Sequence, residues 1–136
     1  MKARWVFAVA VFASGLAQGP AAAHHSFAAE FDRSLPVTVT GTVTKVEWAN
    51  PHIYYYVDVK GPDGKVINYA VEGGTPNQLY RQGWRKDSLK VGDEVTVSGF
   101  KAKDGSNHVN GRKVTLPNGK RVFGASADDG GPAAEK

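Results

Sequence analysis

The chain has 136 residues, no cysteine and one methionine, with 17 basic against 13 acidic side chains. Without cysteine it has no disulfide, no thiolate nucleophile and no zinc–thiolate site, so packing alone must stabilise the fold. The length suits one domain with a modest core. A formal net charge of +4 is too small to indicate a nucleic-acid partner.

The N-terminus has the three parts of a secretory signal peptide. Lys2 and Arg4 supply the positive charge, the apolar run Trp5–Ala17 follows, and Ala21–Ala23 offers the small residues that signal peptidase recognises. At ~1.5 Å per residue the run reaches about 20 Å, too short for a ~30 Å hydrocarbon core, so no stable membrane anchor is expected. We therefore expect a cleaved signal peptide over residues 1–23 and a periplasmic or secreted mature protein with a net charge of about +2.

After the signal peptide the pattern predicts a mainly β structure. Alternating valine and threonine predict a first strand that bends near Gly41. Thr75-Pro76 places an N-cap residue ahead of a proline at the first helical position. In chain order we expect an N-terminal arm over 24–36, strands over 37–48, 52–60 and 66–72, a helix over Pro76–Gln82, a strand over 94–101, a hairpin of 113–116 with 120–123, and a disordered tail over 124–136.

The order of these elements suggests a fold. Three strands, a short helix, two further strands and a terminal hairpin match the five-stranded OB barrel. An immunoglobulin-like sandwich is the alternative, but it would need about seven strands and no helix. We therefore predict an all-β fold, a small OB-like five-stranded barrel over residues 37–123 with one short helix between strands 3 and 4 and a C-terminal hairpin.

Two adjacent histidines would begin the mature chain. The free α-amine and the imidazole of His24 form a chelating pair, and His25 adds another imidazole. His52 lies in the corner Asn50-Pro51-His52, where proline restricts the backbone. Nitrogen ligands of this kind suit Cu(II) first and then Zn(II). The alternative, that the histidine pair is solvated and His52 only caps a turn, stays open.

The carboxylates give weaker indications. Glu30 and Asp32, further along the arm, are candidate oxygen ligands for the same metal. Taken together, the separated carboxylates Glu30, Asp32, Glu47, Glu72 and Asp87 show no spacing that would bring two acidic groups to one site. His108 follows Asn107 in a loop with no partner near it in the sequence, and we assign it no role.

A second interpretation uses aromatic side chains. Tyr54 and Tyr56 would share a strand face with His52, and Trp48 precedes them. The outer face of strands two and three of an OB barrel commonly binds oligonucleotides or oligosaccharides. For an exported protein of low charge, an oligosaccharide, a peptide or a partner protein is the better expectation. Tyr55, Tyr69 and Trp84 are instead expected in or against the core.

Motifs of catalysis are missing. The sequence has no Gly-x-Ser-x-Gly elbow, no phosphate loop and no His-Glu-x-x-His. We therefore assign no catalytic residue and expect a non-catalytic binding protein. Its cofactor would be copper(II) or zinc, and its partner a small ligand or a periplasmic protein.

Several short motifs are spread over nearly the whole mature chain. They are His24–Asp32, Gly41–Trp48, Asn50–His52, Gly83-Trp84, Asp87–Lys90, Gly92–Val95 and Lys103–Ser106. Together they resemble an uncharacterised group of bacterial exported proteins known as domain of unknown function 6152. The resemblance implies a periplasmic domain of β-barrel type and brings no activity. It also indicates that the His-His-Ser start and the Asn-Pro-His corner belong to the family's pattern.

Overall fold

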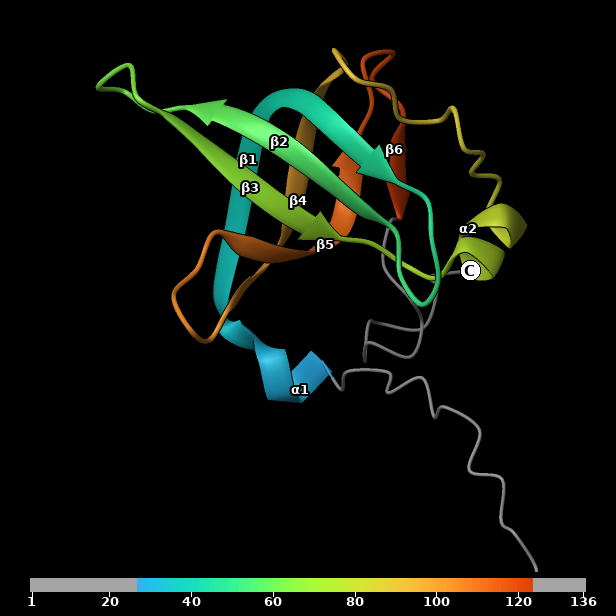
Figure 1. Ribbon diagram of the computed structural model, residues 1–136, viewed down its shortest axis with the longest axis horizontal. Helices are drawn as coiled ribbons and strands as arrows, with labels where there is room; N and C mark the ends of the chain where they lie inside the picture. The colour runs from blue at the N-terminus through green and yellow to red at the C-terminus, as the bar shows by residue number, and fades with distance from the viewer. Residues whose placement is uncertain (1–26, 124–136) are drawn as a thin grey trace, which may run out of the picture.

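The computed structural model describes residues 27–123, which form a mainly β structure (Figure 1). The predicted signal peptide, the histidine pair and the predicted tail over 124–136 lie outside this part of the chain. Between residues 27 and 123, no helix is long and apolar enough to cross a membrane. The elements are the helices α1 (Phe27–Glu30) and α2 (Pro76–Arg81) and the strands β1 (Phe31–Glu47), β2 (Tyr54–Lys60), β3 (Val66–Glu72), β4 (Glu94–Ala102), β5 (His108–Thr115) and β6 (Arg121–Phe123).

The strands form one six-stranded sheet in the order β3–β2–β1–β4–β5–β6, with antiparallel neighbours throughout. β3 also pairs with β5 in parallel, through the Cα partners Ala70 with His108, Val71 with Val109 and Glu72 with Asn110. Each of the strands β1 to β4 therefore has two hydrogen-bonded neighbours, and β5 has three. The parallel pair brings the end of β3 beside the start of β5, although α2 and β4 separate them along the chain.

β1 curves strongly and so pairs with two neighbouring strands (Figure 1). Its first part pairs with β4 and its last part with β2, and the register with β2 shifts between Val43 and Lys45. Gly41 lies just before this shift, close to the predicted bend. A Cβ there would lie 2.0 Å from the backbone oxygen of Asp58, so only glycine allows the two strands to approach this closely. β1 begins at Phe31, earlier than the predicted start at Val37.

The helix and the terminal hairpin agree with the sequence. α2 follows Thr75, whose side-chain oxygen accepts a hydrogen bond from the Gln78 N–H at 3.3 Å. Proline follows at the start of the helix, and Gln82 forms the C-cap. The predicted helix over Pro76–Gln82 between the third and fourth strands is therefore confirmed. β5 and β6 form the predicted antiparallel C-terminal hairpin, but β5 begins at His108, before the predicted start at 113, so His108 lies on a strand and not in a loop.

Alternate strand residues build the main core. Tyr55 and Trp84 are 0% and 3% exposed, and Tyr69 packs against the core while partly buried, as predicted for these three rings. Each large apolar side chain that is fully buried contributes roughly 1.5–3 kcal/mol to folding. The buried members of this core are Val39, Val43, Ile53, Tyr55, Val57, Val71, Leu79, Trp84, Leu89, Val95, Val97 and Val114.

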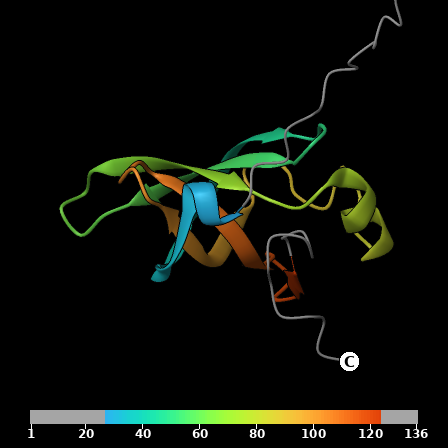
Figure 2. The ribbon, with the colours of Figure 1, turned by 90° about the horizontal axis from the view of Figure 1, so that it is seen from below.

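A second, smaller cluster fixes α1 to the sheet. Phe27 and Phe31 are 8% and 2% exposed and pack with Ala102, and Phe100 lies against them. Seen from below, α1 lies in front of the strands (Figure 2). The segment that the sequence indicated as a polar arm is therefore, from Phe27 onward, a short helix and a strand held by two buried phenylalanines.

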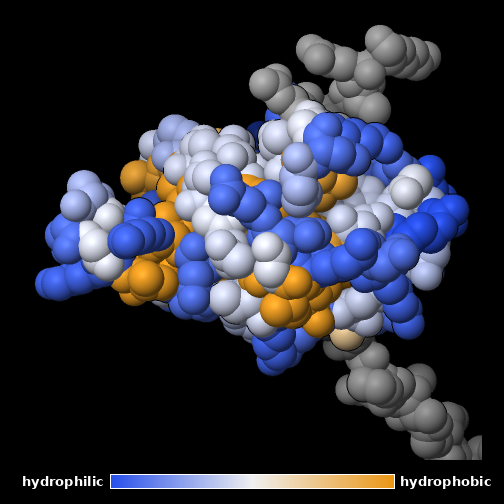
Figure 3. All heavy atoms as spheres, turned by 90° about the horizontal axis from the view of Figure 1, so that it is seen from above, coloured by the Kyte–Doolittle hydropathy of each residue, from blue (hydrophilic) through white to orange (hydrophobic). Residues whose placement is uncertain are grey.

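The surface seen from above is mostly hydrophilic, with separate hydrophobic patches (Figure 3). Among the described residues, the exposed large hydrophobic side chains are Leu35, Val66, Ile67, Tyr80 and Val91. Apart from the adjacent Val66 and Ile67 they are dispersed along the chain, and single exposed apolar side chains of this kind are ordinary on protein surfaces.

Candidate metal centre

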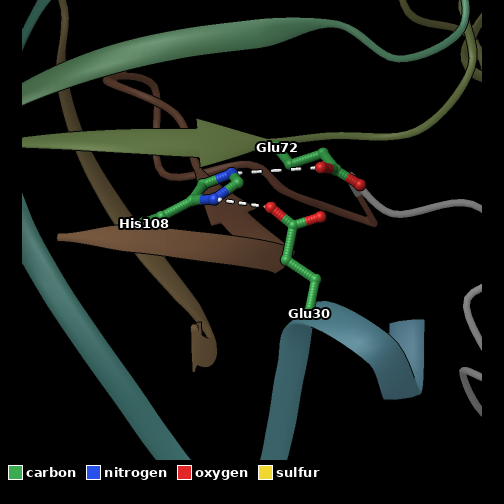
Figure 4. A group of neighbouring side chains, drawn as sticks. All are labelled: Glu30, Glu72 and His108. Atoms are coloured by element: carbon green, nitrogen blue, oxygen red, sulfur yellow. Dashed lines mark ion pairs between the residues drawn. The ribbon is translucent and has the colours of Figure 1, made fainter. Parts of the chain in front are cut away.

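Glu30, Glu72 and His108 come together where α1, β3 and β5 meet (Figure 4). One ligand atom from each residue lies within 4.8 Å of the others. The parallel pairing of β3 with β5 places Glu72 and His108 on adjacent strands. Glu30 is the last residue of α1, and it reaches the same place because the next residue, Phe31, pairs with Ala102 of β4. The group combines two carboxylates with one imidazole.

His108 lies between the two carboxylates. Its Nδ1 is 3.1 Å from Oε1 of Glu30, and its Nε2 is 3.9 Å from Oε2 of Glu72. Rings on both sides hold the imidazole, with centroid distances of 4.9 Å to Phe31 and 5.8 Å to Tyr54. Nε2 is buried and has no hydrogen-bond partner among the described residues. This nitrogen therefore faces a carboxylate oxygen across a gap too long for a direct hydrogen bond.

Glu72 is the buried acid of the group. The residue is 2% exposed, and its Oε2 accepts a hydrogen bond of 2.6 Å from the hydroxyl of Tyr54. Burial raises the pKa of Tyr54, and the hydrogen bond to Glu72 raises it further, so the phenol stays protonated and keeps donating. A buried carboxylate is costly unless positive charge or hydrogen bonds compensate for its lost hydration. The hydroxyl of Tyr54 supplies only part of that compensation.

His52 lies on the other side of Glu72. It is 5% exposed, and its Nδ1 is 3.0 Å from the carbonyl oxygen of Gly73 and 3.9 Å from Oε1 of Glu72. Because a carbonyl can only accept, Nδ1 carries the proton and donates it. In the neutral ring Nε2 is then the basic nitrogen, the arrangement in which a backbone carbonyl orients many metal-binding histidines. The peptide bond Asn50–Pro51 that precedes His52 is cis.

Of the remaining predicted site residues that the structure describes, Asp32, Tyr56 and Trp48 lie apart from this group, whereas Tyr54 contacts it. Asp32 accepts hydrogen bonds from the backbone and hydroxyl of Ser34, which lower its pKa, and it is not a member of the cluster. Tyr56 donates to Glu47 at 3.2 Å. Trp48 packs edge-on against Tyr80 with ring centroids 5.7 Å apart. Tyr54 stands against His108 and Glu72, so it is engaged in the acidic cluster.

Two expectations drawn from the sequence are wrong. His108 was expected to have no partner, yet its two ring nitrogens lie 3.1 Å and 3.9 Å from carboxylate oxygens of Glu30 and Glu72. The carboxylates were expected to stay apart, yet Glu30 and Glu72 converge on one imidazole. Glu30, predicted as an oxygen ligand, does lie in the group. His24 and His25 lie outside the described residues, so their part in metal binding stays a prediction.

Solvent reaches the group from the side of α1. The side chains of His108 and Glu30 are 19% and 30% exposed, whereas that of Glu72 is only 3% exposed. A pocket of about 340 Å³ lies beside Glu30 and is lined by Ala29, Glu30, Lys103 and Asp104. A small ion can therefore approach through Glu30 and His108 and meet Glu72 at the inner end.

The partly buried Tyr54 and the fully buried Tyr55 predict loss of stability at alkaline pH. Burial raises the pKa of both Tyr54 and Tyr55 above the ordinary value of about 10. The unfolded chain therefore loses these protons first, so their contribution to stability is complete below pH ~10 and falls as the pH rises further. We expect urea unfolding to show decreasing stability above that pH. Tyr54→Phe should make the decrease shallower, and an unchanged slope would contradict the assignment.

Comparison with known proteins identifies a family but no activity. Residues 12–112 match the model of a protein family described as a family of unknown function (DUF6152). No curated protein matches the chain. The match includes all three residues of the cluster, His52 and Tyr54.

Proposed function

The chain belongs to this family of unknown function, DUF6152, and we propose that it is an exported, non-catalytic metal-binding protein. One divalent ion would be held by Glu72 and Nε2 of His108, with Glu30 joining them when its carboxylate turns from Nδ1 of His108 toward the ion, and with His52 and the N-terminal pair His24–His25 as further donors. Export rests on the signal-peptide pattern of the first 23 residues. The partner would be a small ligand or another periplasmic protein.

We also propose that the sheet forms an OB-like barrel that presents this site. The ring of pairings β1–β2–β3–β5–β4–β1 supports it, because each of these strands has two neighbours. The position of α2 between β3 and β4 supports it too. In this arrangement the seam between β3 and β5 is where the ring closes, and the metal site lies at that seam.

The observation that carries the proposal is the gap between Nε2 of His108 and Oε2 of Glu72. Nδ1 of His108 lies 3.1 Å from a Glu30 oxygen, so in a neutral ring with its proton on Nδ1 the unprotonated Nε2 lies 3.9 Å from a carboxylate oxygen of Glu72. An unprotonated nitrogen and a carboxylate oxygen this close in a buried place repel each other unless a cation lies between them. Zinc bonds of ~2.0–2.2 Å to nitrogen and oxygen would set the two atoms about 3.4 Å apart in tetrahedral geometry. The observed 3.9 Å needs a shift of only about 0.5 Å.

The donors suit a divalent ion. Two carboxylates balance its charge, and imidazole is a ligand for Zn(II) and Cu(II). No sulfur ligand is present after residue 1, which disfavours Cu(I). His25 stands two residues before Phe27, so its Cα is within about 7.6 Å of the start of α1. A free N-terminal amine and imidazole would therefore be tethered near the cluster.

The proposal is tested by metal titration of the mature protein beginning at His24. Calorimetry with Zn(II), Cu(II) and Mn(II) should give about one equivalent bound for at least one of these ions. Glu72→Gln keeps the size of the side chain and removes its charge, so affinity should fall by about 100-fold or more. Glu94→Gln, which changes an exposed carboxylate on β4, is the matched control and should leave affinity unchanged.

The alternative is that a proton, not a metal, lies between His108 and Glu72. Absence of binding for all three ions, or equal binding by Glu72→Gln, would overturn the metal proposal. The N-terminal pair is examined in the same titration with one residue added ahead of His24. Weaker Cu(II) binding would support its chelating role, and an unchanged affinity would remove His24 from the site while leaving the cluster in place.

A further inference from the structure

Asn110 is a buried amide without a partner. It is 1% exposed, and neither Oδ1 nor Nδ2 has a hydrogen-bond partner among the described residues. Burying both polar atoms unpaired lowers the stability of the fold, and native proteins rarely leave such a side chain unpaired unless it serves a ligand or water. The residue is therefore a candidate for a binding role.

The register of the sheet places Asn110 beside the metal site. It is the Cα partner of Glu72 on β3 and of Phe100 on β4, and Glu72 is in turn the partner of Tyr54 on β2. Partners on adjacent strands are about 4.8 Å apart and project to the same face. Asn110 therefore stands between Glu72 and the aromatic cluster that holds α1.

The alternation of side chains along β5 also places Asn110 on the face of the sheet that carries the metal site. Val109 is fully buried, and a Cβ on Gly111 would meet Val71, Tyr55 and Val97, so these two positions face the main core. His108 and Asn110 alternate with them and share the opposite face. The register shift in β5 lies beyond Asn110, so it does not disturb this face. The side chains of His108 and Asn110 therefore project from the same face of the sheet.

We propose that Oδ1 of Asn110 is the fourth ligand of the ion held by Glu30, Glu72 and His108. This inference rests on the proposed function. The two carboxylates already neutralise a divalent ion, so the remaining donors are best neutral, as the imidazole and the amide are. Amide oxygens are ordinary ligands of ions that prefer oxygen. With Asn110, the described cluster supplies three oxygens and one imidazole nitrogen, a set that suits an ion of the Zn(II) or Mn(II) class.

The experiment uses Asn110→Leu, which keeps the approximate size and removes both polar atoms. The metal-free variant should unfold at the same urea concentration as the wild type or at a higher one, because an unpaired buried amide has been removed. Its affinity for Zn(II) should fall by about tenfold or more. Asn68→Leu on β3 is the matched control, since Asn68 is exposed and bonded to Asp58, away from the site.

A second variant separates the loss of a ligand from the loss of the fold. Asn110→Asp restores an oxygen ligand, so it should bind Zn(II) at least as tightly as the wild type, while its metal-free form is less stable because a third carboxylate is buried. If Asn110→Leu binds Zn(II) as the wild type does, or if Asn110→Asp binds it more weakly, the fourth ligand is refuted. Loss of binding in Glu72→Gln alone would then leave the proposed function standing. Failure of the wild type to bind any of the three ions would remove both proposals.

Discussion

Gly99→Ala is expected to lower the stability of the fold by about 3 kcal/mol or more, the upper range for overpacking. For a domain of this size that corresponds to a fall of about 12 °C or more in the thermal midpoint. The reason is steric. A Cβ on Gly99 would lie 1.9 Å from the backbone oxygen of Asn110 and 2.9 Å from its carbonyl carbon. Both atoms are backbone of β5, so the clash can be relieved only by moving β5 away from β4.

Gly61→Ala is the matched control. Gly61 does not have a positive φ either, and the nearest atom to its added Cβ is the side-chain oxygen of Asp63 at 3.0 Å, which can rotate away. The thermal midpoint of the Gly61→Ala variant should change by only a few degrees. Thermal unfolding followed by circular dichroism compares the two variants. Equal, small changes for both would show that β4 and β5 are not held as close as the structure places them.

The same substitution also links the fold to the site. The carbonyl that Gly99 would meet belongs to Asn110, two residues from His108 on β5. If the variant folds with β5 displaced, the distance between His108 and Glu72 must change as well. The effect on stability and the effect on metal affinity should therefore appear together.

The local parts of the fold follow from the sequence. Thr75 and Pro76 define the start of α2 by themselves, because an N-cap hydroxyl and a proline at the first turn act over three or four residues. The turn at Gly61–Gly64 joins β2 to β3, and Gly64 adopts the positive φ of 80° that the turn requires. Tyr55 was expected in the core because it alternates with its neighbours, and it is fully buried.

The site could not be found in this way, because it depends on a non-local contact. Glu72 and His108 meet only through the parallel pairing of β3 with β5, and no spacing in the sequence encodes that register. Among its neighbours in the sequence His108 has no partner, so local patterns assign it no role. A strand-by-strand model of the OB topology, which pairs strands three and five, would have placed the start of β5 beside the end of β3 and indicated His108.

The structure of the N-terminal arm was missed for a different reason. The sequence indicates an arm over residues 24–36 ahead of the predicted barrel, with His24, His25, Glu30 and Asp32 as its candidate ligands. The two phenylalanines were the overlooked signal: Phe27 and Phe31 are buried and fix α1 over the sheet. Once α1 is held, Glu30 at its end must lie near β5, which is why Glu30 joins the group and Asp32, bonded to Ser34, does not.

A bound ion should stabilise the protein strongly and reversibly. With free Zn(II) at about 100 times its dissociation constant, binding to the folded state alone adds ~2.7 kcal/mol, which corresponds to a rise of roughly 10–20 °C in the thermal midpoint. The three ligands lie far apart in the sequence and converge only in the folded chain, so the unfolded state gains little. Thermal unfolding with and without Zn(II), followed by addition of a chelator, measures the shift and its reversal.

The location of the stabilisation can be measured as well. The backbone N–H of Lys103 donates to the carbonyl oxygen of Glu30 at 2.9 Å, so it reports on how firmly α1 is held. An ion that joins Glu30 to Glu72 and His108 should slow hydrogen exchange at Lys103 while leaving the amides of α2 unchanged. Glu72→Gln should lose both the thermal shift and the slower exchange. A Zn(II)-induced rise that persists in Glu72→Gln would mean that the ion stabilises the chain from another place, and the buried gap beside His108 would then have to be filled by a proton.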